Sequence, residues 1–166
     1  MNEAHLHLVL NHFPIIVPIV GLLILIVGFF TDSETVKRTA FGVFVLGAIL
    51  TFPAMYTGEG AEEIAEKLPG VTDQLIHKHE EQAETFAILN YILGLVALVG
   101  FWASWKQKQF DNWIAIVVLV LGLAGLYLGK VTGTSGGEIR HTEIRADYNS
   151  DQKVTPSNEN TKESDD

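Results

Sequence analysis

The residues best suited to chemistry in this chain are its six histidines, and the chain has no cysteine. The histidines occur near the N-terminus, in the middle of the chain and after the last apolar segment, as His5, His7, His12, His77, His79 and His141. Imidazole nitrogens bind divalent transition metals and serve as axial ligands of haem iron. The absence of cysteine excludes disulfides, thiolate metal sites, cysteine-held iron–sulfur clusters and haem attached through Cys-x-x-Cys-His. Any bound metal is therefore expected to rely on nitrogen and oxygen ligands.

His12 lies inside the apolar entry of the first hydrophobic segment, just before a Phe-Pro pair. An ionisable side chain at that depth is costly unless it is paired or coordinated. One interpretation is a b-type haem whose axial ligands are His12 on the first helix and His79 or His77 on a facing helix. The alternative is an interfacial imidazole that donates to a carbonyl left without its helical partner by Pro14 or Pro18.

A second possible site combines histidine with carboxylates. On a helix, His77 would share a stripe with Glu80, Glu81 and Glu84, because residues spaced by three, four and seven lie on one face. Nitrogen and oxygen donors of this kind suit Zn, Cu or Fe. Further metal ligands predicted near the same level are His5, His7, Glu59 and His141. The alternative to a metal site is a solvated polar stripe. His79 lies about 200° around the helix from His77, so only one of the two is expected to face the bundle.

The segment 130–141 is rich in glycine and hydroxyl side chains. It lacks the order of a P-loop. We predict a loop folded back over the bundle mouth, with Arg140 and His141 able to meet Glu59 or Glu80. Because no serine–histidine–acid constellation can be assembled, no catalytic residue is predicted, and whether the protein is an enzyme is left open.

Four apolar segments must position these side chains, at 9–30, 40–56, 86–105 and 113–129. About 20 helical residues span a hydrocarbon core of roughly 30 Å. Hydrophobic residues make up 48% of the 166 residues, and the mean hydropathy is +0.24. The sequence therefore predicts an all-α integral membrane four-helix bundle over residues 1–145. Pro14 and Pro18 predict a kinked entry to the first segment.

Two polar stretches lie outside the apolar segments. Residues 74–85 contain good helix formers without Pro or Gly, which predicts an extended extramembrane helix continuous with the third segment. Residues 146–166 are mostly polar and charged, and such a composition buries too little apolar surface to fold. This segment is predicted to be a disordered acidic tail.

Basic residues in the short connections predict the orientation. Lys37 and Arg38 separate the first two segments, and Lys106 and Lys108 separate the last two, so both connections are expected to face the cytoplasm. Basic residues after the last segment weaken this asymmetry. We expect a multi-pass protein of the inner (plasma) membrane, with its termini on the outer, periplasmic side. The lipid bilayer is the predicted partner, and the net charge of −9 argues against nucleic acid.

The pattern His-Leu-Val-Leu-Asn-His-Phe-Pro, from His7 to Pro14, resembles the domain-of-unknown-function 2231 (DUF2231) type of four-helix bacterial membrane protein. The hydrophobic layout agrees with that family over residues 1–145. Relatives of this type can occur fused or adjacent to cytochrome c modules, so the resemblance implies membrane redox chemistry with a cytochrome c or another membrane redox subunit as partner. It also implies a role for His12, which belongs to the family pattern. The resemblance supplies no established activity.

Two functions remain open at the level of sequence. The first is binding of b-type haem or a divalent metal at a histidine- and glutamate-lined outer face, for membrane electron transfer. The second is a non-catalytic structural or accessory subunit of a membrane complex. Haem would need an apolar cavity between the first and third apolar segments, whereas a metal cap would need three or four ligands about 2.0–2.2 Å from one point. A transporter built from an internal repeat finds little support.

Overall fold

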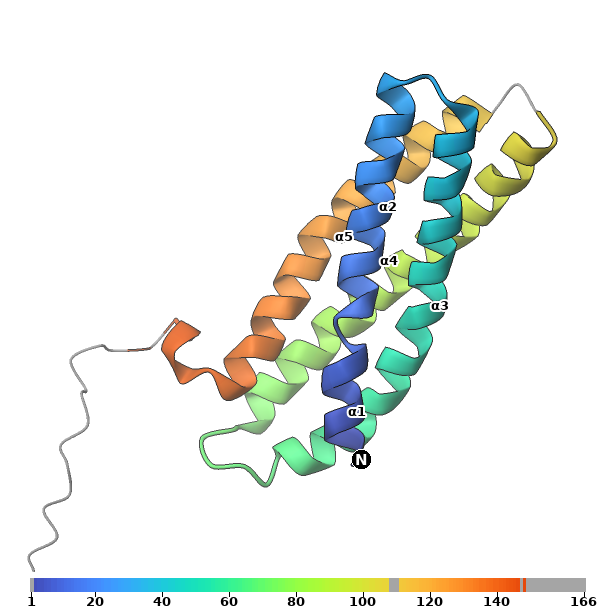
Figure 1. Ribbon diagram of the computed structural model, residues 1–166. Helices are drawn as coiled ribbons and strands as arrows, with labels where there is room; N and C mark the ends of the chain where they lie inside the picture. The colour runs from blue at the N-terminus through green and yellow to red at the C-terminus, as the bar shows by residue number, and fades with distance from the viewer. Residues whose placement is uncertain (1, 108–110, 147, 149–166) are drawn as a thin grey trace, which may run out of the picture.

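The computed structural model describes residues 2–107, 111–146 and 148, and this part of the chain is helical without strands. Its elements are α1 (Glu3–Leu10), α2 (Phe13–Phe30), α3 (Glu34–Ala65), α4 (Asp73–Trp105), α5 (Asp111–Arg140) and the 3-10 helix η1 (Thr142–Ile144). Figure 1 shows α2 to α5 as an up-and-down bundle, with α1 leading into α2 and packed beside α3. Four helical stretches are long and apolar enough to cross a membrane: 3–30, 34–65, 73–105 and 112–140. The predicted all-α four-helix architecture is confirmed; the exact membrane boundaries stay predictions.

The two ends of the bundle carry different side chains. The end of α2, the start of α3, the end of α4 and the start of α5 lie at one end (Figure 1), which we call the tryptophan end because Trp102, Trp105 and Trp113 lie near it. The beginning of α1, the α3–α4 connection and the end of α5 lie at the other end. We call it the histidine end, because an even number of crossings brings all six histidines there.

The first apolar segment is interrupted at residues 11–12, in agreement with the predicted kinked entry. Pro14 lies in the first turn of α2, where its missing N–H would have had no helical acceptor. Pro18 lies inside α2 and leaves the Pro14 carbonyl without a helical donor. Asn90 of α4 supplies that donor, because its Nδ2 lies 3.1 Å from the Pro14 carbonyl oxygen and 3.3 Å from Thr51 Oγ1. One buried amide therefore joins α2, α3 and α4.

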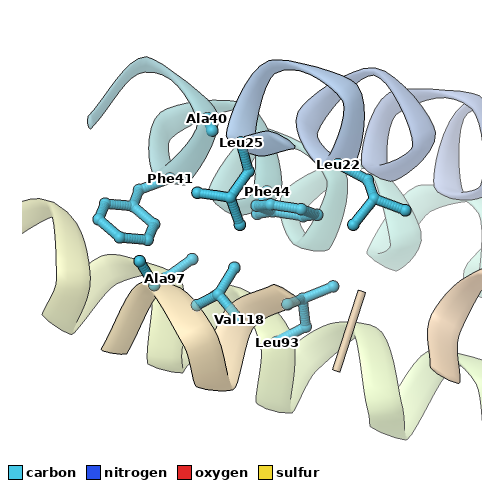
Figure 2. Packing of buried hydrophobic residues seen from close by; sticks show 9 residues of the cluster. Leu22, Leu25, Ala40, Phe41, Phe44, Leu93, Ala97 and Val118 are labelled. Carbon is cyan, nitrogen blue, oxygen red and sulfur yellow. The ribbon is translucent and has the colours of Figure 1, made fainter. Parts of the chain in front are cut away.

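The core of the bundle lies between this amide and the tryptophan end. Figure 2 shows apolar side chains from α2 and α3 facing those of α4 and α5: Leu22, Leu25, Ala40, Phe41, Phe44, Leu93, Ala97 and Val118. Gly47 permits close contact of α3 with α2, since a Cβ there would lie 2.9 Å from Pro18 Cγ. Large apolar side chains also cover the outside, such as Leu95 at 66% exposure. Helices that are apolar all round are typical of a bundle surrounded by lipid.

The structure changes one sequence-based expectation. Residues 130–140, predicted as a loop, continue α5 to Arg140, because packing against α4 outweighs the low helix propensity of glycine. Glu59 lies within α3, which continues beyond the second apolar segment to Ala65. The predicted extension of the third segment is confirmed as part of one unbroken α4. Of the predicted disordered tail, only Ala146 and Tyr148 are among the described residues, and the rest lies outside them.

Candidate functional site at the histidine end

His7 is held by the pair α1 and α3. Its Nδ1 lies 3.1 Å from the Ala54 carbonyl oxygen and 3.2 Å from Thr57 Oγ1. Since the carbonyl can only accept, and the Thr57 hydroxyl donates to backbone carbonyls, Nδ1 must carry the proton. The ring is half-buried and lies beside Gly58, where a Cβ would be 3.7 Å from Cε1. The lone pair of a neutral His7 ring is therefore on Nε2.

His79 is held in the same way by the pair α4 and α5. Its Nδ1 lies 3.0 Å from Ser135 Oγ, and that hydroxyl donates to the Thr132 carbonyl oxygen at 3.0 Å. When the serine proton goes to the Thr132 carbonyl, Nδ1 of His79 is the donor. Gly136 makes room for the ring, since a Cβ there would lie 2.9 Å from Cε1. In that tautomer a neutral His79 ring also carries its lone pair on Nε2.

The two half-buried imidazoles lie at the same end of the bundle, each anchored by a different helix pair. A positive charge on His7 would act electrostatically on His79. Within the described part of the chain, neither Nε2 takes part in a hydrogen bond. Metal-binding histidines are commonly oriented in this way, with the second ring nitrogen donating to a carbonyl or another polar group. His7 and His79 can therefore offer two nitrogen ligands to one ligand-binding region.

His5 and His12, which were also predicted as ligands, are both exposed. His12 is exposed, and its Nδ1 lies 3.2 Å from the Leu8 carbonyl oxygen. This acceptor belongs to the preceding turn and is not one of the carbonyls freed by Pro14 or Pro18. His5 is exposed in the first turns of α1, where its backbone N–H is capped by the side chain of Asn2. Among the described residues no contact joins His12 to His77 or His79.

The predicted stripe on α4 is present and solvated. His77 is 70% exposed, with Nδ1 3.5 Å from Glu80 Oε2 and Nε2 3.4 Å from Glu81 Oε1. Glu84 is exposed on the same helix. As their spacing predicts, His77 and His79 point into different surroundings. This stripe has the geometry of surface ion pairs, which stabilise a helix only weakly.

The remaining predicted ligands do not converge on a metal centre. Glu59 is one of several carboxylates that interact electrostatically with Glu62 of α3. His141 contacts Glu143 at 2.8 Å, where it was predicted to meet Glu59 or Glu80. The backbone N–H of Glu143 and the imidazole of His141 hold the pKa of the Glu143 carboxyl below its ordinary value. Within the described ranges, no group of three or more histidine and carboxylate side chains is arranged to hold a metal ion.

The two hydroxyl residues that contact these histidines, Thr57 and Ser135, were not predicted from the sequence. A hydroxyl followed by a glycine occurs at Thr57-Gly58 on α3 and again at Ser135-Gly136 on α5. In each case the hydroxyl contacts Nδ1 of a histidine and the glycine lies beside its ring. This repeated pair was visible in the sequence, but only the packing of α1 on α3 and α4 on α5 assigns each pair to its histidine.

Comparison with known proteins gives one match. The model of the family described as "Predicted membrane protein (DUF2231)" matches residues 3–143. Neither the curated proteins nor the solved structures contain a significant match. The family match covers all four long apolar helices and the histidine end, and it agrees with the resemblance carried by residues 7–14. The chain therefore belongs to the DUF2231 family of predicted membrane proteins.

Proposed function

We propose that the protein binds b-type haem through Nε2 of His7 and Nε2 of His79 and transfers electrons at the membrane. The observation that supports this proposal is the pair of half-buried imidazoles, each oriented through Nδ1, from two separate helix pairs. When bound, haem supplies reversible one-electron transfer, with a potential set by its axial ligands and their hydrogen bonds. The geometry favours His7 over His12 as the ligand from the first apolar segment.

The number of ligands favours haem over a divalent metal. Haem iron needs only two axial ligands from the protein, whereas a Zn site generally takes three or four protein donors. His7 and His79 provide two nitrogens, and the described residues offer no trio of histidine and carboxylate donors. A pair of imidazoles from facing helices is also the ligand arrangement that helix bundles commonly use for cofactors.

Haem binding requires the mouth of the bundle to widen. An apolar crevice between α2, α4 and α5 includes Phe86, two turns below His79, and holds only about 10 Å³. Pockets for larger ligands hold roughly 300–1,000 Å³. The α1 helix packs on α3 and makes few contacts with α4 or α5, but α3 and α4 also pack against each other, so widening requires that packing to loosen near the mouth. The role of the chain is to orient both imidazoles and to exclude water from one side of the site.

The test is a reduced-minus-oxidised visible spectrum of protein purified in mild detergent from haem-replete cells, with metal analysis of the same sample. We expect Soret and α bands in the wild type and their loss in His7→Ala and in His79→Ala. The matched controls His12→Ala and His77→Ala should keep the bands, because both rings are exposed. A colourless wild-type protein would overturn the proposal. It would leave a metal site if metal is found, or a structural or accessory subunit if it is not.

A further inference from the structure

Two consecutive cations at the tryptophan end have opposite surroundings. Lys37 is buried, and its Nζ lies 2.7 Å from Glu34 Oε1, 2.7 Å from Asn112 Oδ1 and 3.5 Å from Asp32 Oδ1. Arg38 is half-buried, and no carboxylate of the described residues forms an ion pair with it. The positive charge of Lys37 is therefore paired with carboxylates, whereas Arg38 has no carboxylate partner among the side chains that the structure describes.

Arg38 is nevertheless held in a defined position. Its Nε donates to Ser104 Oγ at 3.3 Å and its Nη2 to the Ser104 carbonyl oxygen at 3.0 Å. The guanidinium carbon lies 5.6 Å from the centre of the Trp105 ring, within cation–π range. A guanidinium has five N–H donors and Ser104 engages two of them, which leaves three for another acceptor. The site is thus prepared for an anion.

An apolar cavity lies directly beside this cation. It has a volume of about 490 Å³ and is lined by Leu98, Val99, Phe101, Trp102 and Trp105 of α4. Trp105 connects the two features, since it lines the cavity, stacks on Phe101 with ring centres 6.0 Å apart, and lies under Arg38. Phe101 in turn lies against α3 one turn beyond Arg38, at Gly42. The cavity is open to the outside and is lined by α4 alone, so it lies on the outer face of that helix beside the guanidinium.

We propose that Arg38 and this cavity bind one anionic phospholipid, with the phosphate on the guanidinium and an acyl chain along α4. Leu98, Trp102 and Trp105 are spaced by four and three residues and lie on one exposed stripe of the helix, where a chain can pack. Arginine matches phosphate oxygens with paired N–H donors, and tryptophan is enriched at the level of lipid headgroups. A free phosphate would use only the cation and a neutral lipid mainly the cavity. An anionic phospholipid uses both.

The first test measures lipid-dependent thermal unfolding of the full-length protein in neutral detergent, followed by tryptophan fluorescence. Phosphatidylglycerol is added to one sample and phosphatidylcholine with the same acyl chains to another. We expect phosphatidylglycerol to raise the Tm of the wild type more strongly, and Arg38→Gln to weaken its apparent affinity about fivefold. The matched control Arg140→Gln removes an exposed arginine at the histidine end and should keep the preference. Equal preference in Arg38→Gln and the wild type would overturn the proposal.

A second variant tests the apolar half of the site without touching the cation. Leu98→Trp fills the cavity and should reduce the effect of phosphatidylglycerol, whereas Ile88→Trp, at another exposed position of α4, should not. Inorganic phosphate at matched concentration should leave the Tm unchanged. A shift with phosphate alone equal to that with phosphatidylglycerol would identify an anion site without lipid and would contradict the proposal. Equal shifts with the two lipids in the wild type would also contradict it.

Discussion

The two ends of the bundle differ in how completely their polar groups are paired. At the tryptophan end, the buried Lys37 joins the α2–α3 connection to α3 and α5 through three oxygen partners. Toward the histidine end, side-chain oxygens of Asn11, Gln82 and Asn90 are buried without hydrogen-bond partners in the described structure. The Nε2 atoms of His7 and His79 lie in the same half. Unpaired buried polar atoms are costly, so natural proteins commonly keep them where a ligand or water will complete them. The paired Lys37 therefore contributes stability at the first end, and the unpaired atoms of the second end lie in the half of the bundle where we propose haem binding.

The largest expected loss of stability is at the tryptophan end, where Lys37 is paired. Lys37→Met keeps the buried methylene groups and removes the charge, which leaves Glu34 and Asn112 without their shared partner. We expect the free energy of unfolding in mixed micelles to fall by about 3 kcal/mol, near the lower bound for breaking a buried ion pair because Glu34 is partly exposed. The control Lys106→Met removes an exposed lysine nearby and should change little. Equal free energies of unfolding for Lys37→Met and Lys106→Met would contradict the stabilising role of the paired Lys37.

The next largest loss of stability is expected from the side-chain amide of Asn90, which lies between the two ends. Asn90→Ala removes the donor to the Pro14 carbonyl and to Thr51, and we expect it to cost about 2 kcal/mol. In a Pro18→Ala background the restored N–H can satisfy the Pro14 carbonyl within α2. The cost of Asn90→Ala should therefore be smaller there, as measured by a double-mutant cycle. The same cost in both backgrounds would mean that the freed carbonyl is not what Asn90 satisfies.

A smaller effect is expected from Ser135 at the histidine end. Ser135→Ala removes the acceptor of the His79 Nδ1 proton while the imidazole itself remains. If His79 binds haem, the apparent haem affinity should fall about tenfold, as for other groups that orient a metal-binding histidine. Haem titration measures this affinity. Thr134→Ala, which removes the exposed neighbouring hydroxyl, is the matched control. If the Ser135→Ala protein binds haem as tightly as the wild type, the Ser135 hydroxyl has no role in haem binding.

The smallest effect is expected at His141 and Glu143, beyond the end of α5. The pKa of Glu143 is lowered in the folded protein, so its interactions contribute above the pKa of the unfolded state and are lost as pH falls through the folded-state pKa. Because both side chains are exposed, His141→Ala should raise the pKa of Glu143 in an NMR titration while the Tm stays unchanged. A clear loss of Tm would show instead that the His141–Glu143 pair stabilises the fold at the histidine end.

The gathering of the histidines at one end follows from the sequence, but the surroundings of each histidine do not. An even number of crossings places all six histidines at one end, and helical spacing separates His77 from His79. The prediction of His12 as the principal ligand rested on its depth in the first apolar segment. The structure places that ring outside, because α1 packs its His7 face against α3 and His12, five residues on, lies about 140° further round the helix. Helical period separates His12 from His7, but it does not say which of the two faces the bundle.

By itself, the sequence determined the membrane class, the four apolar helices, the continuity of α4 and the gathering of histidines at one end. These properties depend on hydropathy, length and helical period, which are local along the chain. Only the tertiary structure decided that α5 continues through its glycine-rich end, that Thr57 and Ser135 contact His7 and His79, and that among the described side chains carboxylates pair with Lys37 and not with Arg38. These properties depend on contacts between helices, where a neighbour dozens of residues away supplies the missing partner or leaves it absent.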